Sequence, residues 1–305
     1  MTRYRDICAE LAGQVASGDL PPGAELAGVR ALALRFDTTA STISRAERVL
    51  AEAGVIVLAD RRRARVAPGG PPAARRFLHG ETVLRLAGSD DPALDIVVRT
   101  LGRAIQPVGA NGSSAGLRAV WQGRADAAAV HLLHHSGEYN GPFARGLLRG
   151  MGPHSIHLWR REQGLLTPPG NPAGLRSVTD LLGCRVAKRH TGTGTRTLLD
   201  RLIRDSGADP DAVRGPDVGS HLEAALAVAS GAVDAAVGVR SAARDLELHF
   251  VPLTWEDYDV VLGVEALGAA APLIGALHSA EVRAAVEALR GYDTTHSGRV
   301  RALGP

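Results

Sequence analysis

The chain changes character near Pro68, and this change limits the folds open to it more than any other feature does. Before Pro68, a compact pattern of short helices ends in an arginine cluster. After it begins a much longer pattern in which glycines separate apolar segments. The 305 residues exceed the usual size of one domain, and each part is long enough to bury its own core. We therefore predict an N-terminal domain at 1–68, a linker at 69–80 and a larger domain at 81–305.

The composition argues against membrane and exported proteins. The chain is 45% hydrophobic and 22% charged, and no uninterrupted apolar run approaches the roughly 20 residues that span a bilayer. The first residues carry charges where a signal peptide needs a continuous apolar stretch, so we expect a cytoplasmic protein. Cys8 and Cys184 fall in different predicted domains and form no CxxC pair, which argues against a disulfide framework or a structural zinc site.

The first part predicts three helices. Residues 4–17 form an amphipathic pattern, and a second helix is expected at about 27–36, after a turn rich in proline and glycine. The apolar stripe of the first helix consists of Ile7, Leu11 and Val15. A third helix follows the turn at 37–39, with Thr39 or Ser41 as its N-cap. Its inward face is expected to carry Ile43, Val49 and Leu50, and its outward face Thr42, Ser44, Arg45 and Arg48.

A two-stranded hairpin with a charged tip is expected after the third helix. Its strands are the apolar run 55–58 and the run 63–66. Between Asp60 and Arg76 there are six arginines against one acid, a local excess that can neutralise phosphates. These arginines are Arg61, Arg62, Arg63, Arg65, Arg75 and Arg76. A solvated, arginine-rich linker is the alternative, because Lys188 is the only lysine of the chain.

The order of these elements resembles the GntR-type winged helix-turn-helix. The motifs that carry the resemblance are Gly-x-Leu-x-Pro-Gly at 18–23, Leu-x-x-x-Arg-x-Leu-Ala at 26–33, Ser-Thr-Ile at 41–43 and Leu-x-x-x-Gly-Val-Ile at 50–56. The resemblance implies binding to double-stranded DNA through Arg30, Ser41, Thr42, Ser44, Arg45, Arg61, Arg62 and Arg63. Ala40 stands where the family commonly has arginine, so a base preference does not carry over. A helical module for docking or dimerisation is the alternative.

The second part contains an internal repeat. A buried strand at 82–87, a polar loop and a helix at 92–104 come first. A glycine-serine helix start, a helix, a Gly-x-x-Asp turn and a short apolar strand then occur twice, about one hundred residues apart. The copies run from Gly112 to Ala128 and from Gly219 to Ala236. Helices alternating with short apolar strands predict parallel α/β sheets in two similar lobes, with ligands at the strand ends.

The loop 190–196, His-Thr-Gly-Thr-Gly-Thr-Arg, is the best candidate for an anion cradle. Glycines let the backbone approach a ligand closely, and free N–H groups at a helix start attract an anion. It is neither a P-loop, which needs a Gly-Lys-Ser/Thr ending, nor a dinucleotide fingerprint, because its glycines are too close together. The alternative is a glycine-loosened turn with ordinary threonine caps.

From about 81 to 300 the chain resembles the periplasmic-binding-protein-like domain (type 2, molybdate-binding-protein-like) found fused to molybdopterin-biosynthesis proteins and helix-turn-helix regulators. The resemblance is carried by segments 112–117, 123–126, 131–133, 137–140, 161–165, 170–172, 192–196 and 291–294. It implies two α/β lobes around a cleft that binds a small oxyanion, with molybdate or tungstate as the first candidate. The candidate ligand-binding residues are Ser89, Ser113, Ser114, His131, Thr191, Thr193, Thr195, Arg196 and Ser220. His134 and His135 stand where the family often has aspartate.

We therefore expect a ligand-responsive transcription regulator, α/β in class and a homodimer, that binds double-stranded DNA and a small anionic effector. No catalytic residue, cofactor or metal site is expected. The histidines near His131 lack the cysteines or carboxylates that complete a metal site. Two alternatives are an enzyme fused to the winged helix and a cytoplasmic anion-binding protein without a DNA function. A pyridoxal-phosphate enzyme would need Lys188 as its Schiff-base lysine.

Overall fold

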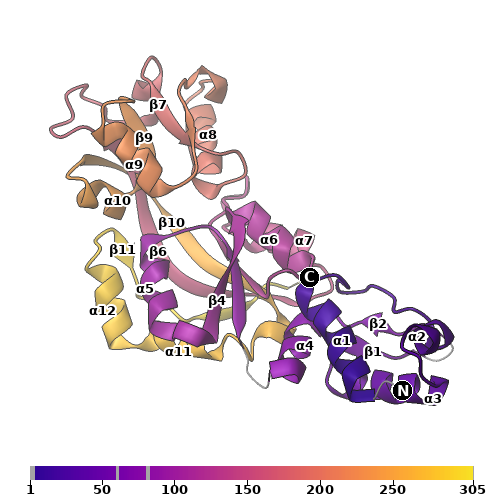
Figure 1. Cartoon of the computed structure of the whole chain (residues 1–305). Coiled ribbons are helices and arrows are strands. Elements are labelled where there is room, and N and C mark those ends of the chain that lie inside the picture. Colours follow the sequence, from indigo (N-terminus) through magenta and orange to yellow (C-terminus); the bar gives the residue numbers. More distant parts are fainter. Residues whose placement is uncertain (1–3, 60–61, 80–82, 305) are drawn as a thin grey trace.

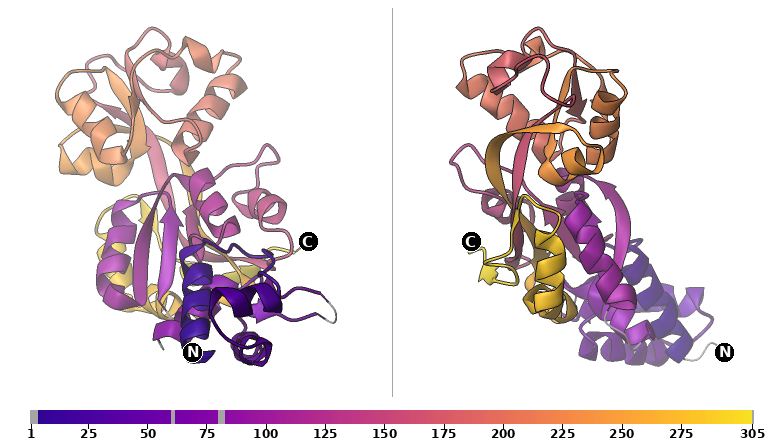
Figure 2. Two further views of the ribbon diagram at one scale, coloured as in Figure 1. Left: turned by 45° about the vertical axis from the view of Figure 1, so that its right-hand side comes forward. Right: turned by 90° about the vertical axis from the view of Figure 1, so that its left-hand side faces the viewer.

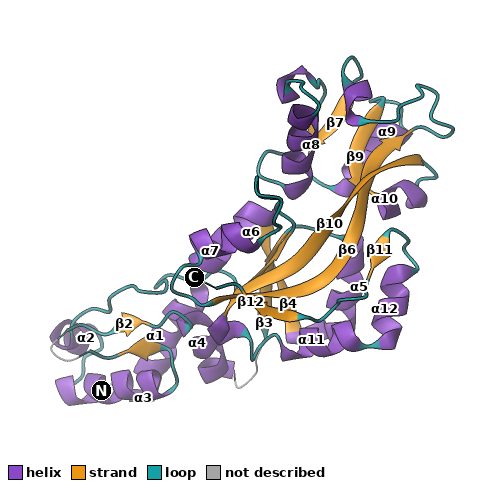
Figure 3. Ribbon diagram, turned by 180° about the vertical axis from the view of Figure 1, so that it is seen from behind, coloured by secondary structure: helices purple, strands orange, loops and turns teal. Residues whose placement is uncertain are grey.

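The computed structural model describes residues 4–59, 62–79 and 83–304. It has three parts: an N-terminal helical unit and two α/β lobes (Figure 1). Two long strands, β6 (Pro153–Thr167) and β10 (His249–Gly263), run from one lobe into the other (Figure 3). We call the lobe next to the N-terminal unit lobe 1 and the far lobe lobe 2. Arg61, one of the expected DNA contacts, lies outside the described residues.

The N-terminal unit follows the predicted order of elements. It contains α1 (Tyr4–Ser17), α2 (Val29–Arg35), α3 (Ala40–Glu52), β1 (Ile56–Val57) and β2 (Arg65–Val66), the two strands pairing antiparallel. The stripe of α1 is buried as predicted, and Thr39 caps α3 by accepting a hydrogen bond from the Thr42 N–H. On α3, Val49 is only partly buried, whereas Glu47 is buried and its pKa is raised by that burial.

The segment expected to link the two units forms a helix, α4 (Gly70–His79). Pro71 and Pro72 lie in its first turn, where a missing N–H costs no intrahelical hydrogen bond. The helix packs against α1, and its residues Ala73 and Ala74 belong to the hydrophobic core of the N-terminal unit. The connection between the two units is therefore itself part of a packed structure.

The strands of both lobes form one mixed sheet. In the described part of the chain its order is β4-β3-β5-β10-β6-β9-β7-β8, with β11 and β12 also pairing with β6. The remaining strands are β3 (Leu84–Gly88), β4 (Ile105–Asn111), β5 (Ala127–Val130), β7 (Val186–Arg189), β8 (Asp217–Val218), β9 (Ala235–Val239), β11 (Tyr292–Asp293) and β12 (Val300–Ala302). The outer strands of each lobe pair parallel, as predicted, but β6 and β10 run antiparallel to each other and to their neighbours.

Helices cover both faces of the sheet in each lobe (Figure 2). In lobe 1 these are α5 (Pro92–Leu101), α6 (Ser113–Trp121), α7 (Gly141–Leu147), α11 (Ala271–His278) and α12 (Ala280–Glu287). In lobe 2 they are α8 (Gly194–Asp205), α9 (His221–Ala229) and α10 (Arg240–Asp245). Each lobe has two hydrophobic clusters. The lobes therefore have separate cores and can move relative to one another through β6 and β10.

The predicted repeat is confirmed, and its aspartates have the same role in both lobes. Asp126 accepts a 2.9 Å hydrogen bond from the Arg85 N–H, and Asp234 accepts a 2.7 Å hydrogen bond from the Arg185 N–H. Each aspartate thereby joins the turn before one strand to the start of the strand beside it. The first copy leads into β5, which pairs with β10, and the second leads into β9, which pairs with β6.

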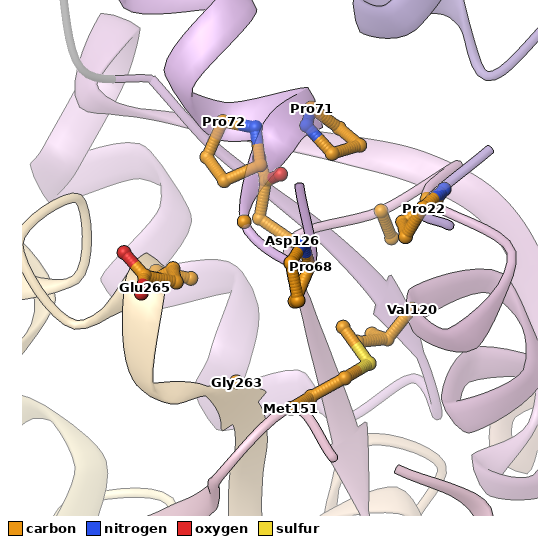
Figure 4. Close-up of a pocket in the computed structure, with 13 residues that line it drawn as sticks. Pro22, Pro68, Pro71, Pro72, Val120, Asp126, Met151, Gly263 and Glu265 are labelled. Atoms are coloured by element: carbon orange, nitrogen blue, oxygen red, sulfur yellow. The ribbon is translucent and has the colours of Figure 1, made fainter. Parts of the chain in front are cut away.

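Asp126 also joins lobe 1 to the N-terminal unit. Its carboxylate forms a buried ion pair with Arg75 of α4, and Arg75 donates to the Ala16 carbonyl of α1 at 3.3 Å. Burial, together with the nearby Arg85 charge, lowers the pKa of Arg75 to about 9. Beside this ion pair lies a small pocket lined mainly by prolines, glycines and apolar residues from both units, with Asp126 among its walls (Figure 4). The N-terminal unit is therefore attached to lobe 1.

We predict that Asp126→Ala lowers the free energy of unfolding by about 3 kcal/mol more than Asp234→Ala does, because it leaves a buried arginine unpaired. Both variants lose the same backbone hydrogen bond, and Asp234 has no ion-pair partner among the described residues. Urea unfolding of both variants measures the difference. Equal losses would show that the ion pair contributes nothing to the attachment.

Candidate functional site

The two lobes meet where the N-terminus of α8 reaches the end of β5. A Cβ atom on Gly194 would lie 2.3 Å from His131 Nδ1, so only glycine allows this approach. Arg201 of α8 donates to the His134 carbonyl at 2.7 Å, and Arg189 of β7 donates to the Asp90 carboxylate at 3.0 Å. We call this contact region the interlobe seam. Direct bonds between the lobes hold it together.

A buried arginine lies at the centre of the interlobe seam. Arg161 of β6 is fully buried and donates to Asp91 at 2.5 Å and to Glu256 at 2.6 Å. Asp91 also caps α5 by accepting the Ala93 and Leu94 N–H groups. Burial alone would lower the pKa of Arg161, but the charges of Glu256 and Asp91 outweigh it and raise that pKa. The guanidinium therefore stays charged.

Glu256 of β10 is saturated by its neighbours. One oxygen accepts from Arg161 and, at 2.6 Å, from Gln163 Nε2, and the other lies 3.1 Å from His131 Nδ1. Burial disfavours its charge, but the Arg161 guanidinium and the hydrogen bonds from His131 and Gln163 hold the pKa of this carboxyl well below its usual range. Because an ionised carboxylate only accepts hydrogen bonds, we infer that Nδ1 of His131 carries a proton.

His131 is a neutral histidine held in one orientation. Burial lowers its pKa, although Glu256 opposes this. With the proton on Nδ1, its Nε2 accepts from the Ser89 hydroxyl, 2.9 Å away. The His131 N–H donates to Ser113 Oγ at 3.2 Å. The only hydrogen of the Ser89 hydroxyl therefore points at His131, whereas the hydroxyl hydrogen of Ser113 stays available.

Several buried side chains of the interlobe seam have polar atoms without a hydrogen-bond partner in the described part of the chain. These atoms are Arg161 Nη2, Gln163 Oε1, Arg189 Nε, Thr195 Oγ1 and both ring nitrogens of His221. All five side chains are at most 4% exposed. They come from β6 and from lobe 2. Buried polar groups in proteins are nearly always bonded, so such a group of unbonded atoms marks a place where a polar ligand binds.

Electrostatic coupling shows that these groups lie close together. Burial, followed by the charges of Arg189 and Arg161, lowers the pKa of His221 well below its usual value, so His221 is neutral. Burial disfavours the charge of Asp90, yet the ion pair with Arg189 holds the pKa of this carboxyl below its usual value. Asp90 and Ser89 also line a cavity of about 290 Å³ at the ends of β3 and β4. This cavity opens beside the interlobe seam.

The structure brings together some of the residues that the sequence predicted to bind ligand. Ser89, Ser113, His131, Thr193 and Thr195 are buried at the interlobe seam. Thr193 caps α8, accepting from the Arg196 N–H and donating to the His190 carbonyl at 2.8 Å. Of these five, only Thr195 has a side-chain atom without any partner among the described residues.

The other predicted ligand residues lie at the margin of the interlobe seam or are bonded within lobe 2. Thr191 is exposed and Ser114 half-buried. Arg196 donates to Asp200 at 2.9 Å and to Asp217 at 3.2 Å. Ser220 caps α9 by accepting from the Glu223 N–H.

Sequence reasoning missed the charged and amide side chains of the seam. These are Asp90, Asp91, Arg161, Gln163, Arg189, His221 and Glu256. A signal existed for two of them, because Arg161 and Gln163 are two residues apart in an extended segment that continues into the apolar residues 164–166. Alternate residues of a strand face the same side.

Lys188 is in β7, and its ammonium donates to the Val213 carbonyl at 2.8 Å.

The expected DNA-binding residues lie on the surface of the N-terminal unit. Arg30, Ser44, Arg45, Arg62 and Arg63 are exposed. The guanidinium of Arg45 stacks 4.2 Å from the centre of the Tyr4 ring, which holds this arginine at the surface of α3.

The hydroxyls of Ser41 and Thr42 lie 2.9 and 2.8 Å from Thr39 Oγ1, at the start of α3. Both side chains therefore take part in the N-terminal turn of the helix.

Two α/β lobes joined by crossing strands, with buried polar groups converging between them, define a two-lobed ligand-binding fold. Residues 100–277 match the family described as the PBP superfamily domain. The chain therefore belongs to the PBP superfamily. The uncharacterized protein YvgK of Bacillus subtilis (strain 168) is 31% identical to it over 223 residues, which are 70% of this chain and 72% of that protein.

Solved structures share the fold at low sequence identity. The H2O2-bound OxyR C206S mutant of Corynebacterium glutamicum is 15% identical, covers 94% of this chain and 96% of its own, and gives a TM-score of 0.50. The sulfate-binding protein SubI from Mycobacterium tuberculosis H37Rv is 18% identical, covers 70% and 86%, and also gives a TM-score of 0.50. None of the helices in the described part of the chain has the length and apolar character of a membrane span.

We predict that the protein loses stability as the pH falls below about 6.5, where free histidine gains a proton. His131 and His221 have lowered pKa values in the fold, so the unfolded chain binds protons that the folded chain does not. The contribution of the two histidines to the free energy of unfolding is complete above the pKa of free histidine. It is lost as the pH falls towards their lower pKa values in the folded chain. Each histidine can add a slope of up to about 1.4 kcal/mol per pH unit.

Urea unfolding between about pH 7.5 and 5 measures this slope. His221→Asn should reduce it, while His249→Asn, at an exposed position, should leave it unchanged. A wild-type stability that stays constant over this range would contradict the assignment of two neutral buried histidines.

Proposed function

We propose that this protein is a ligand-responsive transcription regulator that binds a small anion in the interlobe seam and double-stranded DNA through its N-terminal unit. In this proposal the protein acts in the cytoplasm as a homodimer and has no catalytic activity. The observation that carries it is the group of unbonded polar atoms on five buried side chains of β6 and lobe 2.

The available hydrogen-bond donors favour an anionic ligand. Arg161 Nη2 and Arg189 Nε are charged donors without a partner among the described residues, and Thr195 Oγ1 can add a neutral one. Hydrogen bonds from guanidinium groups to anions are stronger than neutral ones, especially away from water. SubI, which shares the fold, is named as a sulfate-binding protein. Molybdate and tungstate, suggested by the sequence resemblance, are therefore the first anions to test.

Closure of the two lobes around the ligand is the mechanism by which ligand binding would change the affinity for DNA. The unbonded atoms belong to lobe 2 and to β6, while Asp90, Ser89 and Ser113 face them from lobe 1. A ligand that contacts both sides binds the closed arrangement better than an open one, and it shifts the equilibrium by that difference in affinity. A coupling of about 1–3 kcal/mol changes affinity for a second partner by roughly 5- to 150-fold.

The order of elements in the N-terminal unit supports the proposal of a winged helix-turn-helix. Two helices joined by a tight turn, α2 and α3, precede a short hairpin, and α3 exposes Ser44 and Arg45. The alignment with the OxyR structure covers 94% of this chain, so it includes most of the N-terminal unit. Winged helices generally meet two-fold related half-sites, which favours a dimer.

The attachment of the N-terminal unit to lobe 1 connects the two functions. Because Arg75 and Asp126 pair at this junction, the DNA-binding unit moves together with lobe 1. Lobe 2 is the part that ligand binding displaces relative to both. In a dimer, closure would therefore change the spacing or orientation of the two recognition helices.

We predict that at least one anion among molybdate, tungstate, sulfate, phosphate and small organic acids raises the melting temperature, since a ligand that binds only the folded state stabilises it. Arg189→Met should abolish the shift, because it removes a buried charged donor. Arg185→Met, at an exposed position just before the other end of β7, is the matched control and should keep it. Stabilisation by neutral compounds alone would contradict the anion site, and turnover of the ligand would contradict a purely regulatory role.

We predict that the wild-type protein enriches a two-fold symmetric sequence from a random duplex library, because a dimer of winged helices meets two half-sites. Changing Arg45, Arg62 and Arg63 together to alanine should weaken binding to that sequence at least about tenfold, since phosphate and base contacts are lost. Fluorescence anisotropy measures the affinity. Arg99→Ala, at an exposed position on α5, is the control. Anion binding without any DNA enrichment would favour a binding protein without a DNA function.

A further inference from the structure

The interlobe seam contains a hydrogen-bond acceptor whose identity is fixed by its neighbours. The side-chain amide of Gln163 presents one end to Glu256 at 2.6 Å and leaves the other end unbonded in the described part of the chain. Glu256 also accepts from Arg161 and His131, so it is an ionised carboxylate that can only accept. The end of Gln163 that faces it must be the NH2 group. The free end is therefore the carbonyl oxygen.

His221 of α9 provides a second acceptor in the interlobe seam. The neutral ring of His221 always presents one donor nitrogen and one acceptor nitrogen, whichever tautomer is present, and neither nitrogen has a partner among the described residues. The ring lies against Gly238, where an added Cβ would be 3.5 Å from Nδ1. The carboxylate of Asp90 adds a further acceptor at the rim.

These acceptors restrict the anion. Sulfate and molybdate carry no hydrogen near neutral pH, so neither can satisfy the carbonyl oxygen of Gln163. A buried acceptor left facing another oxygen costs the complex about tenfold or more in affinity. A ligand that carries its own O–H or N–H group satisfies the acceptors and the two arginines together.

We propose that the effector is a small anion that carries a hydrogen-bond donor of its own, and that the carbonyl oxygen of Gln163 is the atom that selects it. Hydrogen phosphate, a hydroxy acid and an amino acid share this chemistry. This inference rests on the proposed anion site and narrows the ligand class within it.

Matched pairs of anions test the inference by isothermal titration calorimetry on the full-length protein. The pairs are hydrogen phosphate against sulfate, at about pH 8 where both are dianions, and lactate against pyruvate, in which a keto oxygen takes the place of the donating hydroxyl group. In each pair that binds, the member with the donor should bind at least about tenfold more tightly.

Gln163→Met keeps the length of the side chain and removes both the acceptor and the Nε2 donor to Glu256. It should reduce the preference within a pair to less than about twofold, mainly by weakening the member with the donor. Gln106→Met, at an exposed position on β4, is the control and should keep the wild-type preference. If Gln163→Met does not fold, the wild-type comparison still decides the ligand class.

The outcomes separate this inference from the proposed function. Sulfate or pyruvate binding as tightly as its partner would overturn the inference while leaving the anion site in place. An unchanged preference in a folded Gln163→Met protein would overturn the role of Gln163. If no anion in either pair or in the wider panel binds, the anion site itself is wrong.

Discussion

The interior of this protein is organised around one buried positive charge. A fully buried guanidinium is tolerated only if carboxylates surround it, and Arg161 has two, Asp91 and Glu256. Asp91 fixes the start of α5 in lobe 1, while Glu256 orients Gln163 and His131. These contacts determine which polar atoms remain free to meet a ligand. Removing either carboxylate would therefore disturb both the packing of lobe 1 and the geometry of the site.

Separate cores and shared strands give the molecule its capacity to move. Each lobe has its own hydrophobic clusters, but β6 and β10 belong to both. The pairing of these two strands shifts register between Tyr258 and Asp259 and again between Pro252 and Thr254. Irregular pairing of this kind bends strands, and the two shifts lie at the two ends of the stretch of β10 that joins the lobes. The N-terminal unit is attached to lobe 1, on one side of this bend, so a movement of lobe 2 would change the position of lobe 2 relative to that unit.

Local sequence patterns predicted much of the architecture. The apolar stripe of α1, the Thr39 cap and the repeated Gly-x-x-Asp turns each depend on residues close together in the chain. The helix α4 was missed because Gly70, Pro71 and Pro72 suggest a break, although proline is favourable in the first turn of a helix. The motif at 190–196 was correctly placed at the start of a helix, and the structure adds that this helix start faces the other lobe.

The charged centre of the site could not be predicted in the same way. Glu256 and Arg161 are 95 residues apart and meet only through the pairing of β10 with β6. No spacing rule joins them, and each alone is an ordinary charged residue of a strand. Likewise, His221 follows a predicted cap, but its burial beside Arg189 depends on how α9 packs on β9. Long-range pairing decides these contacts.

The proposed function depends most on closure of lobe 2 onto lobe 1 around a bound anion. The most direct measurement is the distance between spin labels at the exposed positions Arg99 on α5 and Arg204 on α8, with both native cysteines replaced by alanine. With a bound anion, the account predicts one narrow distance distribution that corresponds to the closed arrangement, and without it a broader distribution that extends to longer distances. An identical distribution in both states would contradict it.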